Sequence, residues 1–276
     1  MTPDIDSVTQ IIAEAAAEAV LPRFRSLAAH EIREKEAGDL VTVADVEAEA
    51  FLTRRLAELL PGSLVVGEEA AEEDPEVLLH LAKEAAYVWV IDPVDGTGNF
   101  SRGIEDFAMM VGLTRGSEIL GGWIHRPVGG MTAVAERGGG ARLDGQPLKV
   151  AAPAAPLEMR GTLNAGTFGD KALGARIQSR RERVGAVRSL RCAGLEYLRL
   201  SSGETHFSLF TKTKPWDHVP GALIHAEAGG YGRLLDGRRY SPQSGDAKGL
   251  LLAPSEEGWQ ALHATLLDGE NVTPRG

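Results

Sequence analysis

The sequence predicts a mixed α/β (α+β) protein made of two halves, residues 1–152 and 153–276, that form one catalytic unit. Residues 107–150 alternate apolar runs with glycine pairs and turn dipeptides, which is typical of an antiparallel meander. After a Pro- and Ala-rich connector around residues 153–156, short strands and helices alternate, which is typical of an α/β half. A chain of 276 residues is long enough to bury the core of both halves.

The first half should begin with two helices. Apolar residues recur at helical spacing over residues 5–27, which predicts an amphipathic helix. A second helix should start after Thr42 and stop at the Pro-Gly pair of residues 61–62. Apolar runs rich in β-formers and a polar segment between them then predict a strand, a helix and a second strand at residues 64–66, 75–83 and 87–91.

The second half should continue the alternation. We expect helices over residues 173–183 and 195–201, and strands over residues 162–165, 187–190 and 207–209. A longer helix should begin at Trp216 and Asp217, because Asp217 stands where an N-cap belongs, and it should end at the glycine pair 229–230.

The composition disfavours nucleic-acid and membrane partners. Counting 29 Lys and Arg against 39 Asp and Glu gives a net charge of −10, which repels a nucleic-acid backbone. The most basic stretch, residues 176–191, is typical of the solvated face of a helix and its following turn. Cys192 is the only cysteine, so an intramolecular disulfide is excluded, and neither a signal peptide nor a membrane-length apolar run is found. We therefore expect a cytoplasmic protein.

The hexapeptide Asp-Pro-Val-Asp-Gly-Thr at residues 92–97 is the densest chemical signal. It follows the predicted strand 87–91 directly, so Asp92 and Asp95 leave a strand end together. Pro93 stiffens the link, and Gly96 lets the backbone approach an anion closely. Mg²⁺ prefers oxygen ligands of this kind. Ordinary Asp-Pro and Asp-Gly turns are the alternative for the hexapeptide alone.

Three further carboxylates stand at element ends. Glu68 follows the strand 64–66, where ligand sites of α/β folds gather, although a surface acidic run is the plain alternative. Asp217 could cap its helix or join a metal cluster at the same helix end. Thr42 and Asp45 have capping-box spacing, and Asp45 could also accept a proton from a water. His218 is better explained as a packing residue, since hard cations prefer oxygen.

These blocks, in this order along nearly the whole chain, resemble the inositol monophosphatase family. The matching segments are residues 39–45, 67–69, 92–100 and 216–230. The resemblance implies a layered α-β-α-β-α sandwich, a homodimer, and the hydrolysis of a small phosphorylated substrate with two or three Mg²⁺ ions. It also implies lithium sensitivity.

Carried over position by position, the resemblance implies a role for each matching residue. The implied metal ligands are Glu68, Asp92, Asp95, Asp217 and the carbonyl of Val94. The implied catalytic residues, which orient and deprotonate the attacking water beside the metal, are Asp45, Thr97 and Glu68. The implied substrate-binding residues are Asp95, Gly96, Thr97, Arg191, Ala193 and Phe210.

The departures from the family pattern lie where the leaving alcohol should bind. Phe210 stands where members acting on inositol place a glutamate, and Arg191 precedes Cys192 where a small residue is usual. Arg191 could bind a second anionic group or form a surface salt bridge, and Lys212 and Lys214 could join it or remain solvated. The alternatives to an inositol-phosphate-like or sugar phosphate substrate are therefore a 3'(2'),5'-bisphosphate nucleotidase or a fructose-1,6-bisphosphatase. A non-enzymatic regulatory scaffold is disfavoured, because clustered carboxylates repel one another without benefit to a scaffold.

Overall fold

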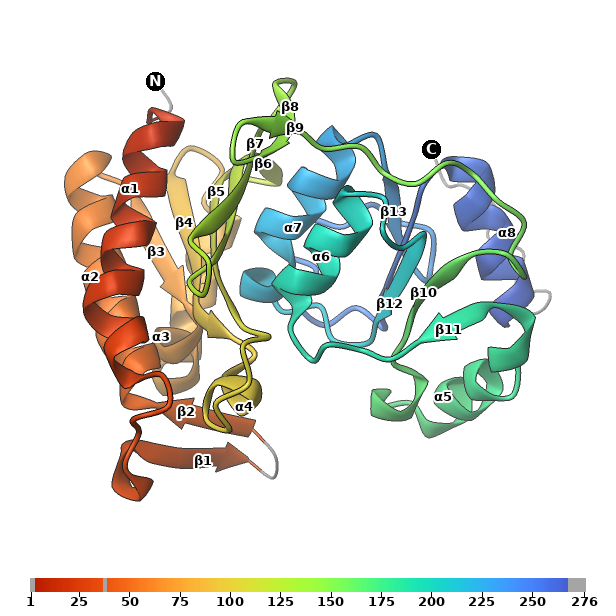
Figure 1. Ribbon diagram of the computed structural model, residues 1–276. Coiled ribbons are helices and arrows are strands. Elements are labelled where there is room, and N and C mark those ends of the chain that lie inside the picture. The colour runs from red at the N-terminus through yellow and green to blue at the C-terminus, as the bar shows by residue number, and fades with distance from the viewer. Residues whose placement is uncertain (1–2, 37–38, 268–276) are drawn as a thin grey trace.

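The computed structural model describes residues 3–36 and 39–267 and consists of five layers, helix, sheet, helix, sheet, helix (Figure 1). The first sheet has seven strands and the second has five. The layered α-β-α-β-α class expected from the sequence is confirmed.

The first sheet has α1 (Ile5–Ala15) and α2 (Val43–Leu59) on its outer face. Side chains alternate along β4 (Tyr87–Asp95): Trp89 and Ile91 join the core beneath these helices, whereas Val88 and Val90 face the interior between the sheets. β3 and β4 are parallel, and every later pair is antiparallel, which is the predicted meander. The strands run in the order β3 (Leu64–Gly67), β4, β5 (Ala108–Arg115), β6 (Glu118–Arg126), β7 (Met131–Glu136), β8 (Gly140–Leu143) and β9 (Gln146–Pro147).

The middle layer consists of α6 (Ala193–Ser201) and α7 (Pro215–Glu227). α7 lies directly on the first sheet: a Cβ added to Gly122 of β6 would lie 2.6 Å from the carbonyl oxygen of Pro220. Only glycine permits this approach. The second half of the chain therefore packs closely on the first, and the division at residue 152 stays a prediction.

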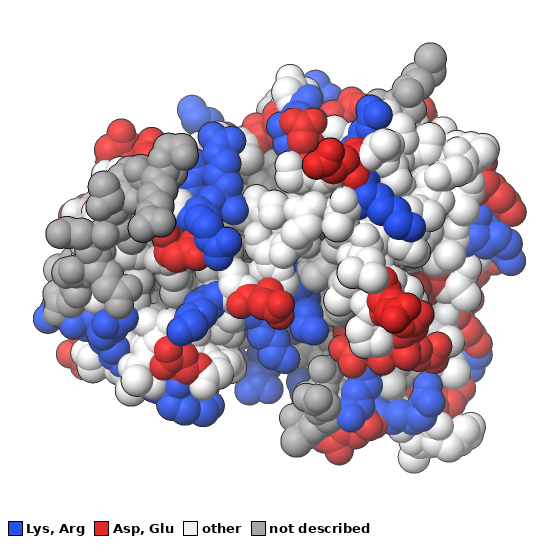
Figure 2. All heavy atoms as spheres, turned by 180° about the vertical axis from the view of Figure 1, so that it is seen from behind, with Lys and Arg blue, Asp and Glu red and all other residues white. Residues whose placement is uncertain are grey.

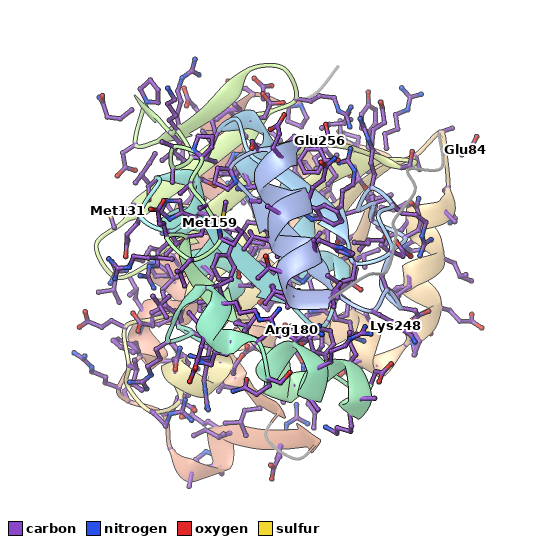
Figure 3. All side chains as sticks on the ribbon, turned by 90° about the vertical axis from the view of Figure 1, so that its right-hand side faces the viewer. Glu84, Met131, Met159, Arg180, Lys248 and Glu256 are labelled. Carbon is purple, nitrogen blue, oxygen red and sulfur yellow. The ribbon has the colours of Figure 1, made fainter. Side chains whose placement is uncertain are left out.

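The second sheet and the outer helices complete the molecule. The strand order is β11 (Gly185–Val187), β10 (Arg160–Leu163), β12 (Phe207–Phe210), β14 (Leu250–Ala253) and β13 (Tyr231–Leu234). The first three of these strands are parallel. α5 (Lys171–Gln178) and α8 (Glu256–Leu267) cover the outer face, and the Arg180 guanidinium donates to the carbonyl of Leu266 at 2.9 Å beneath α8 (Figure 3).

Several predicted elements differ in detail. The first helix continues from α1 as a π-helical turn and a 3₁₀ turn that ends at Arg23, because Pro22 removes a helical N–H donor. Residues 75–82 form a 3₁₀ helix rather than an α-helix. The strand expected at 187–190 ends at Val187. The hairpin of β1 (Ile32–Glu36) and β2 (Asp39–Thr42) was not predicted.

The surface mixes charges of both signs. On the face drawn in Figure 2, Lys and Arg side chains are interspersed with Asp and Glu. No helix within residues 3–36 and 39–267 has the length and apolarity that a membrane span requires.

Candidate active site

Two parallel strand ends bring the first carboxylates together. β3 and β4 are paired up to Gly67 and Ile91, so Glu68, the first residue of α3 (Glu68–Glu73), and Asp92 follow the last paired residues at the same end of the two strands. β4 itself continues to Asp95, four residues beyond the predicted strand end, because Asp92 and Asp95 still pair with β5. The pairing of β4 with β5 is irregular between Asp92 and Asp95. In a regular strand, side chains three positions apart point to opposite faces. The irregularity breaks this alternation, so that Asp92 and Asp95 line the same pocket.

Gly96 makes the turn from β4 into α4 (Thr97–Phe100). Its φ of 88° is in the left-handed region, and an added Cβ would lie 3.0 Å from the carbonyl oxygen of Asp106. The Asn99 amide donates to the carbonyls of Asp106 (2.7 Å) and Leu190 (2.8 Å). The turn is thereby fixed to the segment that precedes α6.

Asp45 and Thr97 form a hydrogen-bonded pair. The predicted capping box is present, because the Asp45 carboxylate accepts from the backbone N–H of Thr42 at 2.8 Å and Thr42 caps α2. The Thr97 hydroxyl lies 3.1 Å from Asp45 Oδ1 and 2.9 Å from the Val94 carbonyl oxygen. Burial raises the pKa of Asp45 to about 7, although the hydrogen bonds from Thr42 oppose the shift.

Asp217 approaches from the second half of the chain. α7 begins at Pro215 with Lys214 as its N-cap, so Asp217 lies in the first turn and the predicted capping role is wrong. Proline at the first helical position sets the start of the helix two residues earlier. Asp217 lines a pocket of about 190 Å³ together with Glu68, Asp92, Val94, Asp95, Gly96, Thr97, Lys212 and Lys214.

The carboxylates of this pocket perturb one another. Burial, followed by the charges of Glu68, Asp95 and Asp217, raises the pKa of Asp92 well above its usual range. Burial also raises the pKa of Glu68, with Lys35 opposing the shift and Asp217 reinforcing it. Such mutual repulsion identifies a site that is suited to a positive ligand.

Asp95 is held by the start of α6. Its carboxylate accepts from the backbone N–H groups of Ala193 (3.0 Å) and Gly194 (2.6 Å) and lies 3.0 Å from the thiol of Cys192. Burial raises the pKa of Asp95, and these donors limit the rise. Asp95 therefore connects the two halves of the protein.

Two charged residues of the site were missed by the sequence analysis. The half-buried ammonium of Lys35 donates to Glu69 at 2.8 Å and to Glu68 at 3.3 Å. Burial opposes its charge, but Glu68 and Glu69 outweigh that effect and raise the pKa of Lys35. Glu49 caps α3 by accepting from the backbone N–H groups of Glu69 and Ala70, both at 2.8 Å. No local pattern marks Lys35, whereas Glu49 lies one helical turn after Asp45.

A second pocket of about 370 Å³ adjoins the first and shares Asp95, Lys212 and Asp217 with it. It contains all three residues that were expected to contact the leaving group, Arg191, Ala193 and Phe210. His218 also lines it, and its ring nitrogens contact Tyr197 Oη (3.0 Å) and the Lys212 carbonyl (2.8 Å), as expected for a packing residue. A larger cavity, about 670 Å³, lies elsewhere, between α5 and the loop that follows β13.

The donor set of the first pocket fits a hard divalent cation. Five acidic residues line it, the four expected ligands and Glu72, together with Val94, whose carbonyl is the fifth expected ligand, and oxygen is the ligand that Mg²⁺ prefers. Within residues 3–36 and 39–267, no three acidic, histidine or cysteine side chains surround a single point at ligating distance. Asp95 and Glu68 instead direct oxygens at N–H donors of α6 and at Lys35, so a cation would have to replace some of these contacts.

Comparison with known proteins agrees with this geometry. The sequence profile of the inositol monophosphatase family matches residues 4–270. A fructose-1,6-bisphosphatase/inositol-1-monophosphatase of Thermotoga maritima is 30% identical over 199 residues, 71% of this chain and 73% of the relative. An inositol-1-monophosphatase of Caulobacter vibrioides is 27% identical over 261 residues, 93% and 96% of the two chains. The structure of inositol monophosphatase II from Staphylococcus aureus, 22% identical, has the same fold, with a TM-score of 0.80 over 98% of both chains. The chain therefore belongs to the inositol monophosphatase family and is an inositol monophosphatase-like phosphatase.

Proposed function

We propose that this phosphatase hydrolyses a phosphomonoester of a small sugar-like or polyol-like molecule, with Mg²⁺ bound by Glu68, Asp92, Asp95, Asp217 and the Val94 carbonyl. The observation that supports the proposal most directly is that these chain-distant oxygen donors line one pocket beside Thr97. The family is generally Mg²⁺-dependent. Two or three bound ions, a homodimer and a cytoplasmic location stay predictions.

Bound Mg²⁺ would supply a Lewis acid that neutralises phosphate charge and makes a neighbouring water more acidic. The residues of this chain then orient and deprotonate that water. Thr97 Oγ1 lies between the Val94 carbonyl and Asp45, so it can hold a water and pass a proton toward Asp45. Glu68, beside Lys35, is proposed to orient the same water. Attack in line with the leaving oxygen needs no covalent phosphoenzyme.

The names of the relatives support the substrate class. The Thermotoga relative is a fructose-1,6-bisphosphatase/inositol-1-monophosphatase, and the Rhizobium meliloti relative, 30% identical over 206 residues, is an inositol-1-monophosphatase. Both names describe phosphate esters of small polyhydroxylated molecules. A 3'(2'),5'-bisphosphate nucleotidase uses the same metal chemistry and is the second candidate, favoured only by the cations of the second pocket.

The proposal is tested with Asp95→Asn. Because the change removes a metal ligand and a negative charge while it keeps the side-chain shape, kcat/KM should fall by at least about 100-fold. The assay is phosphate release from inositol 1-phosphate and fructose 1,6-bisphosphate with MgCl₂. EDTA should abolish the activity of the unmodified protein, and added Mg²⁺ should restore it.

Asp236→Asn is the matched control, because Asp236 pairs with Arg238 on the surface and lines neither pocket of the site. It should keep the activity of the unmodified protein. Unchanged turnover by Asp95→Asn would contradict the metal assignment.

A further inference from the structure

Glu196 is a buried carboxylate that the proposed chemistry does not use. It lies in α6, between the two sheets (Figure 1), and is 3% exposed. Within residues 3–36 and 39–267 its carboxylate forms no ion pair. A charge that is buried without a cation costs free energy unless hydrogen bonds replace the water that it loses. The hydrogen bonds of Glu196 therefore indicate what the residue does.

Four donors from three segments surround the Glu196 carboxylate. Oε2 accepts from the hydroxyls of Thr162 in β10, at 2.8 Å, and Ser208 in β12, at 3.0 Å. Oε1 accepts from the Ser189 hydroxyl and, at 3.2 Å, from the N–H of Leu190. One oxygen thus faces the second sheet, and the other faces the segment that leads into α6. A single side chain links this segment to the sheet.

The segment that precedes α6 is held on both sides. Arg191 has a φ of 55°, in the left-handed region, and its N–H donates to Ser189 Oγ at 3.1 Å. Asn99, from the first half of the chain, donates to the Leu190 carbonyl at 2.8 Å. A strained conformation of this kind persists only where the surrounding contacts impose it. The hydrogen bonds to Glu196 are among those contacts.

The segment ends at the donors that hold Asp95. Asp95 Oδ1 accepts from the N–H of Ala193 at 3.0 Å, whereas Oδ2 accepts from the N–H of Gly194 at 2.6 Å and from the thiol of Cys192 at 3.0 Å. A carboxylate has about four lone-pair sites. In the part of the chain that the structure describes, these donors leave one such site, on Oδ1. The start of α6 therefore sets the direction in which Asp95 can bind a cation.

We propose that Glu196 is a positioning residue of the metal site. By holding Ser189 and Leu190 it fixes the start of α6, and the start of α6 in turn sets the orientation in which Asp95 binds Mg²⁺. Glu196 lines the second pocket but not the pocket of the proposed ligands, so it acts through Asp95 and not by contact with the cation. The inference rests on the proposed metal ligands and names a residue behind them that determines metal affinity.

The test measures cation binding without substrate. EDTA-treated, dialysed protein is titrated with Mn²⁺, which prefers the same oxygen ligands as Mg²⁺ and whose free ion is followed by electron paramagnetic resonance. Glu196→Leu removes all four hydrogen bonds and should raise the dissociation constant of Mn²⁺ by about 10-fold, the lower end of the range for partners of metal ligands. Glu196→Gln keeps an oxygen for Ser189 and Leu190 and should stay within about 3-fold of the unmodified protein.

Ser189→Ala and Ser208→Ala form a matched pair, because each removes one hydroxyl that donates to Glu196. Only Ser189 belongs to the segment before α6, and Thr162 still holds Oε2 when Ser208 is changed. Ser189→Ala should raise the dissociation constant of Mn²⁺ by about 3- to 10-fold, whereas Ser208→Ala should lower the free energy of unfolding and leave the constant within about 2-fold. At saturating Mg²⁺ the kcat of Ser189→Ala should stay within about 3-fold of the unmodified value, because only the affinity is reduced.

Unchanged Mn²⁺ affinity in Ser189→Ala, or equal losses in Ser189→Ala and Ser208→Ala, would overturn the inference. Equal losses in Glu196→Gln and Glu196→Leu would also overturn it, because the charge of Glu196 and not its hydrogen bonds would then determine the affinity. Asp95→Asn separates the two proposals. If it binds Mn²⁺ as tightly as the unmodified protein, the proposed metal site fails and the inference fails with it. If Asp95→Asn alone is weakened, the metal site stands and the role of Glu196 is disproved.

Discussion

Asp45, the proposed general base, is buried at a cost in stability. It is fully buried, and its pKa is raised from 3.8 to about 7, so above neutral pH the fold contains a buried negative charge. Because the native state binds this proton more tightly than the unfolded chain, Asp45 destabilises the protein as pH rises from about 4 to 7. Such a carboxylate is suited to accept a proton near neutrality.

Asp45→Asn should therefore separate activity from stability. We expect kcat to fall by about 100- to 10,000-fold, because a general base is lost. In EDTA at pH 8 the free energy of unfolding should rise by up to ~4 kcal/mol, since three pKa units correspond to about 1.4 kcal/mol each. Urea unfolding at pH 8 and pH 4 measures this free energy, and the gain in stability of Asp45→Asn should vanish at pH 4. An equal gain at both pH values would contradict the ionised Asp45.

At the scale of elements, the junction of β3 and α3 positions Glu68. An added Cβ on Gly67 would lie 2.2 Å from Cδ of Glu49, the side chain that caps α3. The strand end, the cap and the first residue of α3 therefore depend on one another. Their common requirement is a residue without a side chain at position 67.

Gly67→Ala should displace Glu49 and release the N–H groups of Glu69 and Ala70. We expect a loss of about 1–3 kcal/mol in the free energy of unfolding, together with reduced phosphatase activity. Gly166→Ala, at an exposed position with open space around its Cβ, is the control and should stay within about 0.5 kcal/mol of the unmodified protein. Equal stability of the two variants in urea would show that Glu49 can move without cost.

At the scale of the whole molecule, the buried histidines make stability depend on pH. Burial lowers the pKa of His125, His218 and His225 to about 4. The unfolded chain binds these protons near pH 6.5, so each histidine contributes stability above that pH and loses it as pH falls toward 4. The raised pKa values of Glu68 and Asp92 act in the opposite direction, because these groups lose stability as the pH rises. The pH dependence of a single variant, compared with the unmodified protein, is therefore more informative than the pH dependence of the unmodified protein alone.

His225→Phe removes one such group and keeps a planar ring. His225 Nε2 is buried without a hydrogen-bond partner, so little is lost with it. Relative to the unmodified protein, the variant should gain about 1.4 kcal/mol for each pH unit between 6 and 4. Any steric cost of the larger ring is the same at every pH and does not enter this difference. Thermal unfolding of both proteins over a series of pH values measures this difference in stability. A difference that does not change with pH would contradict a neutral buried His225.

Several parts of the fold and site were predictable because they depend on local rules. Strand alternation, glycine turns and the capping box of Thr42 and Asp45 are set by neighbours in the chain. The placement of Asp92 and Asp95 at a strand end follows from the apolar run before them. The role of Lys35 could not be predicted in this way, because its partners Glu68 and Glu69 lie in another element.

The sequence by itself determined the class of fold, the family, and which oxygen-bearing residues stand at element ends. Only the tertiary structure decided that Asp217 meets Glu68 in one pocket, that Asp95 is held by the start of α6, and that Arg191 and Lys212 face the same adjoining space. The physical reason is that periodicity and capping specify the conformation of a few neighbouring residues. Contacts across a hundred residues depend on how five layers pack.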